Sequence, residues 1–316
     1  MKFKGLKILA TAAVLAAILT PSFSTQQVKA ASTTVSVSAP IAYINSDKAY
    51  GEVLVREGNI FVTLTDLKGL GDYNYQYDKV KKQVSITGKG TTVIVSAGSK
   101  TIQNNGNKQP LKVAPFLHKG KMMIPLRAVA DAFNAKVYWN GPAKAAYVTK
   151  PRSETIADLK SKDLSTARNA AITVPHISKL PQAQLEMTYM EMQGMNYYFP
   201  KGKWDKYFIL DNDLASYYEI HNNTAELKWQ AKLGNESKKH SNLFFLTATF
   251  KNEIGTQPNV KNWTIAQFIF RYPVGATYYG LINSKGTLAS GEVELDNHDP
   301  SYKGVIVEIP EESGSK

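Results

Sequence analysis

The chain has 316 residues, of which 43% are hydrophobic, and it contains no cysteine, so disulfides, a lipid-modified N-terminal cysteine and thiolate metal sites are excluded. Its formal net charge at pH 7 is +12. The charge is unevenly placed, because residues 31–150 hold 16 Lys and Arg against 7 Asp and Glu, whereas residues 151–316 hold 18 against 19.

The basic first half favours an anionic partner. Outside a cell, such partners include wall teichoic acids, anionic glycans, phospholipid surfaces and nucleic acid. We expect an anionic cell-wall polymer or glycan, and no nucleic acid. The alternative is a solvated basic surface that only maintains solubility.

Residues 1–30 have the pattern of a secretory signal peptide. Three lysines precede an apolar run over residues 8–19, and small residues suit cleavage before Ala31. This run is shorter than the roughly 20 residues of a membrane-spanning helix, and no later stretch approaches that length. We therefore predict an exported protein of a Gram-positive-type cell, secreted and retained at the wall or released, with no membrane segment in the mature chain. An uncleaved N-terminal anchor is the alternative.

The first half contains an internal repeat. Residues 58–67 align with residues 120–129 at an offset of 62. The match continues in later pairs, among them Tyr75 with Val137, Tyr77 with Trp139, and Asp78 with Asn140. Each copy predicts a glycine turn, a short apolar strand, a small helix, a strand ending in an aromatic residue, and a closing strand.

The helix is predicted most clearly in the second copy. Pro125 precedes residues 126–133, whose apolar residues follow the i, i+3, i+4, i+7 spacing of one buried face. Asn134 is a suitable C-terminal cap. In the first copy, residues 63–70 predict a weaker helix that ends at glycines.

Residues 123–140 resemble the signature of the copper amine oxidase N-terminal domain family, also called stalk domains. The resemblance lies in Pro125-Leu126-Arg127, the small helix, the alternating strand and Trp139-Asn140. It extends over about residues 38–150, although the first copy has Thr63 and Thr65 in place of the proline and the arginine. The resemblance implies an attachment or spacing module on an exported protein.

The resemblance does not imply copper chemistry. The oxidase active site lies in a different domain and needs a cofactor tyrosine and three histidines, two of them in a His-x-His pair. Five histidines are scattered along this chain: His118, His176, His221, His240 and His298. We predict no cofactor, no metal site and no amine oxidase activity.

Two residues of the signature are candidates for a role in binding or in the core. Arg127 is a candidate ligand contact, and the alternative is a structural cap or ion-pair partner. Trp139 is predicted to lie in the core, with its indole N–H satisfied locally.

The second half is predicted to start with a helical linker over residues 151–180 and to continue as a β-rich domain over residues 181–316. Candidate strands are residues 243–250, 265–270, 277–282, 291–295 and 304–309. The whole chain is therefore predicted to be α+β: a duplicated small α+β stalk unit over residues 31–150, a linker helix and a mainly antiparallel β domain.

An aromatic cluster in the second half includes Trp204 and Tyr207, interleaved with Lys201 and Lys203. Exposed planar rings beside lysines could stack on sugar rings or bind an anionic glycan. In the alternative interpretation, the rings are core residues and the lysines form a solvated face. These four residues and Arg127 are the candidate ligand-binding residues.

No catalytic residue is predicted. His298 lies between two aspartates but in a turn sequence, and residues 211–213 with Glu219 lack the spacing of a calcium loop. A glycosidase that uses only carboxylates stays open, because its acid pair has no fixed sequence spacing.

The leading hypothesis is a secreted, envelope-associated, non-enzymatic protein whose basic stalk domain attaches to the anionic wall and presents the β-rich domain. One alternative is a wall or glycan hydrolase or protease carried on the stalk. Another is a secreted effector that acts on a different organism.

Overall fold

The computed structural model describes residues 39–189, 195–234, 249–271, 274–296 and 304–313, so the predicted signal peptide lies outside the described residues. The described chain is mostly β-strand with few helices, which confirms the predicted α+β, β-rich class. No helix among these residues is long and apolar enough to cross a membrane.

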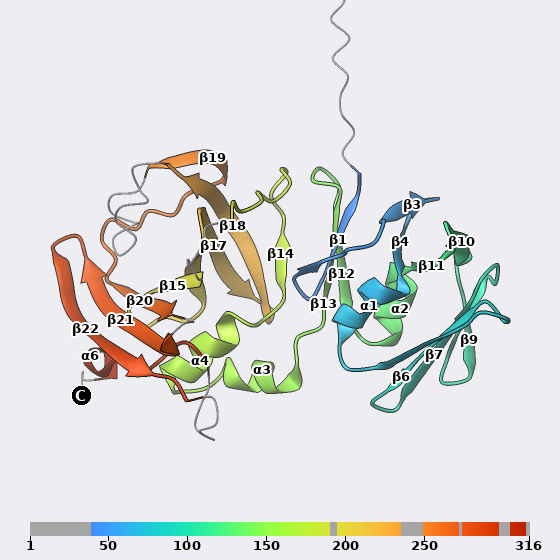
Figure 1. Cartoon of the computed structure of the whole chain (residues 1–316), viewed down its shortest axis with the longest axis horizontal. Helices are drawn as coiled ribbons and strands as arrows, with labels where there is room; N and C mark the ends of the chain where they lie inside the picture. The colour runs from blue at the N-terminus through green and yellow to red at the C-terminus, as the bar shows by residue number, and fades with distance from the viewer. Residues whose placement is uncertain (1–38, 190–194, 235–248, 272–273, 297–303, 314–316) are drawn as a thin grey trace, which may run out of the picture. The chain divides into compact units, whose positions relative to one another are not determined.

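The first half contains three small sheets and two short helices (Figure 1). The first sheet has the order β12-β13-β1-β2, the second β10-β11-β4-β3, and the third β5-β6-β7-β8-β9. Their elements are β1 (Ile41–Ile44), β2 (Asp47–Lys48), β3 (Leu54–Arg56), β4 (Asn59–Thr63), α1 (Leu64–Leu67), the 3-10 helix η1 (Lys68–Leu70), β5 (Asn74–Asp78), β6 (Gln83–Gly88), β7 (Thr91–Ser96), β8 (Thr101–Asn104), β9 (Asn107–Pro110), β10 (Phe116–His118), β11 (Lys121–Pro125), α2 (Leu126–Ala132), β12 (Lys136–Asn140) and β13 (Ala145–Thr149).

The two inner strands of the second sheet, β4 and β11, each continue directly into a helix. The two strands pair antiparallel with Val62 opposite Ile124, and both residues are fully buried. One core cluster joins them to the other two sheets and to α2, through residues such as Val84, Val129 and Val148. A single apolar core thus holds the three sheets together.

The two helices have different N-terminal caps. Thr63 caps α1 in a reciprocal capping box with Asp66, whose carboxylate accepts the Thr63 hydroxyl at 2.6 Å. Pro125 occupies the cap position of α2, and Asn134 beyond its end adopts a left-handed φ of 56°. The observed bounds of α2, α1 and η1 agree with the predicted helices.

The second half begins with two short helices, where the sequence predicted one linker helix. α3 (Ser153–Asp158) ends before Asp163, whose carboxylate caps α4 (Leu164–Ala171) by accepting the Ser165 N–H at 3.1 Å. The polar residues between them therefore form a new helix start and not a continuation.

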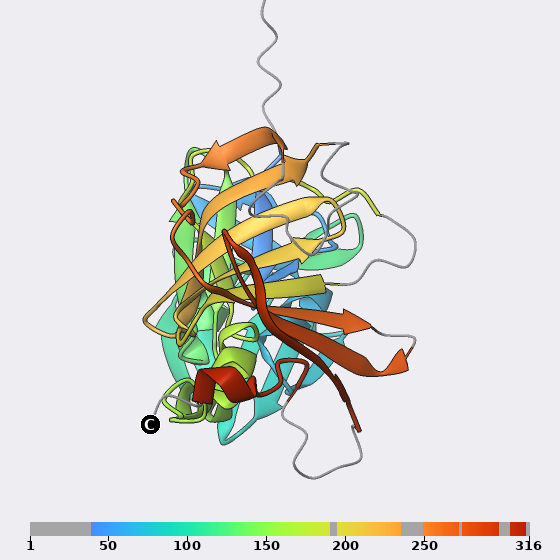
Figure 2. The same cartoon turned by 90° about the vertical axis from the view of Figure 1, so that its left-hand side faces the viewer.

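A nine-stranded sheet follows, with the order β14-β18-β17-β16-β15-β20-β21-β22 and β19 paired to β18. It is strongly twisted (Figure 2). Its strands are β14 (His176–Ser178), β15 (Met195–Pro200), β16 (Lys206–Asp211), β17 (Leu214–His221), β18 (Thr224–Leu233), β19 (Phe250–Gly255), β20 (Ile265–Arg271), β21 (Ala276–Asn283) and β22 (Gly286–Glu294), and α6 (Pro310–Ser313) follows them.

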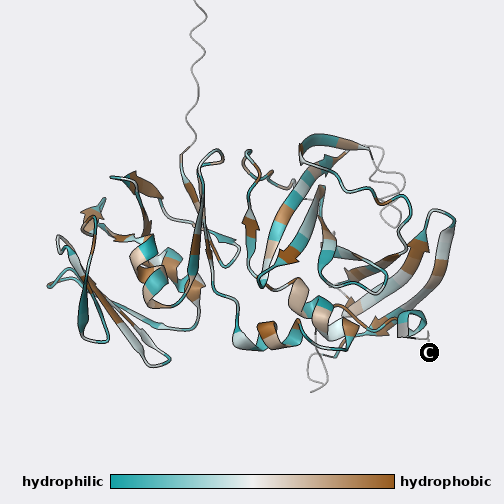
Figure 3. Cartoon of the chain, turned by 180° about the vertical axis from the view of Figure 1, so that it is seen from behind, coloured by the Kyte–Doolittle hydropathy of each residue, from teal (hydrophilic) through white to brown (hydrophobic). Residues whose placement is uncertain are grey.

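Both faces of this sheet are buried over its central strands. Along β16, Tyr207 faces one apolar cluster and Phe208 faces another. The first cluster includes residues of α4 and the segment before α6, and these helices lie along that side of the sheet (Figure 1). Hydrophobic and hydrophilic residues are mixed along the strands in the hydropathy colouring (Figure 3).

The predicted strands of the second half have mixed outcomes. Residues 265–270 and 277–282 are strands, and residues 291–294 form the end of β22. The candidate at residues 243–250 lies almost entirely outside the described residues. The strand predicted at residues 304–309 is wrong, because Ile306 hydrogen-bonds through both its N–H and its carbonyl to the side chain of Asn169 instead of to a neighbouring strand.

A buried ion pair fastens the C-terminal helix α6 to α4. The Arg168 guanidinium makes two bonds to the Glu312 carboxylate, at 2.5 and 2.9 Å, and both side chains are almost fully buried. Arg168 also donates to the Lys203 carbonyl at 2.9 Å and lies 5.0 Å from the centre of the Phe199 ring. This bidentate geometry satisfies charges that would otherwise be buried without a partner.

His176 is half-buried, and its ring packs among aromatic side chains. The His176 ring stacks on Tyr218 with centroids 4.5 Å apart, and its Nε2 lies 3.4 Å from the Tyr207 hydroxyl. Burial among these rings disfavours the charged form and lowers the pKa of His176 to about 4.

We predict that Glu312→Gln lowers the free energy of unfolding by about 3 kcal/mol, because the substitution leaves the Arg168 charge buried and unpaired. Urea denaturation followed by circular dichroism measures this loss. Glu311→Gln in the same helix is the control, since Glu311 is exposed, and its effect should stay within about 0.5 kcal/mol. Equal effects of the two variants would contradict the role of the ion pair.

We predict that His176 destabilises the fold in mild acid. Its pKa rises to its ordinary value on unfolding, so the unfolded chain binds more protons between about pH 6.5 and about pH 4. Stability is therefore complete above this window and is lost as the pH falls through it, by roughly 1 kcal/mol per pH unit. Urea midpoints across this range should depend less on pH in His176→Gln, whereas His221→Gln, at an exposed histidine, should keep the wild-type slope.

Candidate functional site

The predicted aromatic cluster does not form an exposed binding face. Tyr207 is fully buried, and its hydroxyl donates to the Ala171 carbonyl at 3.0 Å. As a ligand-binding residue Tyr207 is thus a wrong prediction, because the core of the sheet occupies both sides of its strand. Trp204 packs partly buried against the same core. Lys201 and Lys203 are exposed in the turn after β15.

Arg127 and Trp139 are brought together in the first half. Arg127 is exposed on α2, and both residues line the same pocket. The prediction that Trp139 lies in the core is wrong, since its side chain is 39% exposed. Val137 on the same face of β12 packs against the core, but Trp139 lies further along this edge strand, at its end.

This pocket, called the Trp139 pocket below, has a volume of about 480 Å³. Its walls come from the β3–β4 hairpin, from β8 and β9, from the start of α2 and from β12. Its polar lining side chains are Asn59, Gln109, Lys112, Arg127 and Asp131. Its apolar lining residues include Val55, Ile60, Pro110, Leu111, Val137 and Trp139.

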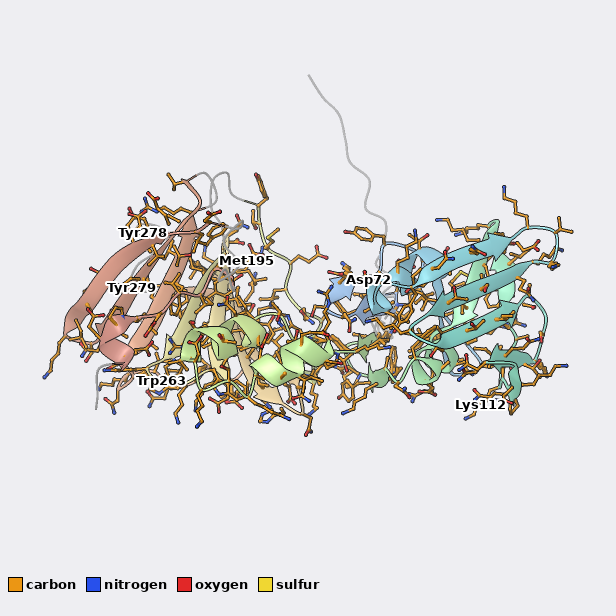
Figure 4. All side chains as sticks on the ribbon, turned by 90° about the horizontal axis from the view of Figure 1, so that it is seen from below. Asp72, Lys112, Met195, Trp263, Tyr278 and Tyr279 are labelled. Carbon is orange, nitrogen blue, oxygen red and sulfur yellow. The ribbon has the colours of Figure 1, made fainter. Side chains whose placement is uncertain are left out.

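A second hollow, of about 600 Å³, is strongly basic, and we call it the basic pocket. Its charged lining residues are the four cations Arg56, Lys82, Lys100 and Lys112 and one acid, Glu57. Lys112 is among the exposed side chains of the first half (Figure 4). Lys112 and Val113 line both pockets, so the two pockets adjoin.

Each cation of the basic pocket comes from a separate turn or strand end. Arg56 ends β3 and lies 5.2 Å from the centre of the Phe116 ring. Lys82 occupies a left-handed turn position between β5 and β6, Lys100 precedes β8, and Lys112 follows β9. Folding collects these charges from four places that are far apart in the sequence.

The charges of the basic pocket are largely uncompensated. Within the described part of the chain, no carboxylate lies within ion-pair distance of Lys82, Lys100 or Lys112. Arg56 has only its neighbour Glu57, at 3.5 Å, and both side chains are exposed. A cluster of solvated cations around one hollow produces a local positive potential that attracts anions.

The other acids and histidines are dispersed. Asp213 precedes β17 and accepts the Thr188 N–H at 2.6 Å, whereas Glu219 lies near the far end of that strand and accepts the Tyr217 hydroxyl. His118 lies 3.2 Å from Glu52, and His298 lies outside the described residues. Over the residues that the structure describes, no three His, Asp or Glu side chains gather in an arrangement that could hold a metal ion.

The basic pocket was not identified from the sequence. The one signal was the excess of positive charge over residues 31–150, which has no position attached to it. The sequence indicates one residue of the Trp139 pocket, because it makes Arg127 a candidate ligand contact but predicts Trp139 in the core.

Comparison with known proteins connects this half of the chain to one family. Residues 43–173 match the family model of the copper amine oxidase N-terminal domain, and no family model matches the rest of the chain. The match ends at 173, beyond the residue 150 expected from the resemblance, and so includes α3 and α4. No curated protein matches the chain. Residues 43–173 are thus a domain of the copper amine oxidase N-terminal domain family.

Proposed function

We propose that this protein is secreted and envelope-associated, and that it acts without catalysis, by attaching to an anionic cell-wall polymer through the basic pocket of its first half. The attached protein would present its β-rich second half as a binding or interaction domain. The observation that carries the proposal is the gathering of Arg56, Lys82, Lys100 and Lys112 around one hollow.

The N-terminal sequence supports secretion, because residues 1–30 have the charge order and run length of a signal peptide. Retention at the wall would then be non-covalent. Electrostatic attraction to a polyanion suits this role, since many weak contacts along a chain add up while each exchanges quickly.

We also propose that the attachment domain is a duplicated unit. The starts of β3 and β10, β4 and β11, β5 and β12, and β6 and β13 are each 62 residues apart. The pairing of Val62 with Ile124, two residues that are themselves 62 apart, is what a two-fold relation between the copies requires. The copies differ beyond this unit, because β13 is followed in its sheet by the parallel β1 and β6 by the antiparallel β7.

The cations of the basic pocket come from the first copy and from the connection between the two copies. Arg56 and Lys82 belong to the first copy, whereas Lys100 and Lys112 come from the connection to the second. A wall polymer with anionic groups at regular intervals could place successive groups near successive cations. Each such contact at the surface contributes little by itself and is screened by salt.

We predict that Lys82→Glu/Lys100→Glu lowers the affinity of the mature chain for purified Gram-positive walls at least tenfold at low salt. The matched control is Lys68→Glu/Lys89→Glu, which changes the net charge equally at exposed lysines of the same half. Lys89, like Lys82, occupies a left-handed turn position. Sedimentation with walls measures the bound fraction, and the control should change it less than threefold.

Wild-type binding should fall steeply as the NaCl concentration rises from about 0.1 M to about 1 M, because the Debye length shrinks from about 10 Å to about 3 Å. Binding that does not depend on the NaCl concentration would contradict the proposal of a basic attachment site. Equal losses of wall binding in the two double variants would contradict it as well. A lytic band of the purified chain in a wall zymogram would contradict the non-enzymatic part.

A further inference from the structure

The Trp139 pocket differs from the basic pocket in its chemistry. It combines apolar walls with two amide side chains, an arginine, a lysine shared with the basic pocket and an aspartate. Its volume of about 480 Å³ lies in the range of small-molecule sites, which are mostly apolar with a few placed polar groups. Such a pocket suits a ligand that has both an apolar face and hydroxyl groups.

Trp139 provides the flat apolar surface of this pocket. Its ring is 39% exposed although tryptophan is the largest apolar side chain, and burial elsewhere in the core would be more favourable for the free protein. An exposed indole at a pocket wall offers an extended apolar face with little conformational entropy to lose on binding. The aliphatic C–H face of a sugar ring matches this surface in shape and polarity.

The polar residues of the pocket supply both kinds of hydrogen-bonding group. Arg127 and Asp131 are four residues apart on α2, so they project from the same side of the helix. In the described residues, neither forms an ion pair with another side chain. Arg127 can only donate and Asp131 can only accept, and the amide of Gln109 can do both, which suits adjacent sugar hydroxyls.

The position of the Trp139 pocket beside the basic pocket indicates that its ligand also carries negative charge. Lys112 and Val113 line both pockets, so a polymer longer than one sugar ring can occupy the Trp139 pocket and still contact cations of the basic pocket. We propose that the Trp139 pocket binds one sugar ring of a wall glycopolymer whose neighbouring anionic groups lie in the basic pocket. This inference rests on the proposed function and names its ligand class: a saccharide chain carrying negative charge, and not a bare polyanion.

The repeat provides a matched position for the test. Tyr77 corresponds to Trp139 in the first copy, and it is similarly exposed, at 36%. It lines a different hollow on its own sheet, together with Gln76, Asp78, Gln83 and Ser85. Removing its ring therefore takes away an exposed aromatic residue without touching the Trp139 pocket.

The experiment compares two probes, heparin as an anionic saccharide and long-chain polyphosphate as an anion without sugar, on the full mature chain. Trp139→Ala should weaken heparin binding about tenfold in titration calorimetry and change polyphosphate binding less than twofold. Tyr77→Ala should leave both affinities within twofold of the wild type. Trp139→Phe, which restores a flat ring, should recover most of the loss.

The outcomes separate this inference from the proposed function. If Trp139→Ala binds heparin like the wild type while Lys82→Glu/Lys100→Glu loses both probes, the sugar subsite is overturned and the basic attachment site stands. Equal losses on heparin and polyphosphate also overturn the sugar subsite. Far-UV circular dichroism and thermal unfolding verify that the variants are folded, which the exposure of Trp139 favours.

Discussion

The antiparallel pairing of β4 with β11 is the constraint on which the first half of the molecule depends. It buries Val62 and Ile124 at the centre of the core and places the start of each helix directly after a paired strand. The outer partners of the same sheet are β3 and β10. The edge strand β3 contributes to both hollows, since Val55 lines the Trp139 pocket and its neighbour Arg56 lines the basic pocket.

In the second half, the corresponding constraint is the buried guanidinium of Arg168, which has hydrogen-bond partners on separate segments. Arg168 binds the Glu312 carboxylate and the Lys203 carbonyl, so the turn that carries Lys201 and Lys203 is held by its backbone. This explains why an interleaved pattern of lysines and aromatic rings produced no binding surface. The rings fill the core beneath the turn, and the lysine side chains remain in solvent.

The sequence predicted those elements whose signal is local. The helix over α2 follows from Pro125 and the spacing of its apolar residues, and β20 and β21 follow from their β-branched and aromatic residues. By contrast, β18 contains Ala, Glu, Leu, Lys and Gln, which favour helices, and it is a strand because its neighbours bury both of its faces. The two pockets could not be predicted from periodicity, because their residues come from several separate elements.

The left-handed turn positions explain how a moderate excess of charge becomes a local site. Lys82, Lys89, Lys119 and Lys144 all have a positive φ, in turns where glycine or asparagine would be less strained. A lysine at such a position lowers the stability of the fold, and its side chain adds no packing in return. The same positive charge on a strand would cost less stability. Turns place the charge at hairpin ends, and Lys82 meets Lys100 and Lys112 there at one hollow. Of the four left-handed lysines, Lys82 is the one that lines the basic pocket, so the local site depends on where the turns lie and not on the net charge alone.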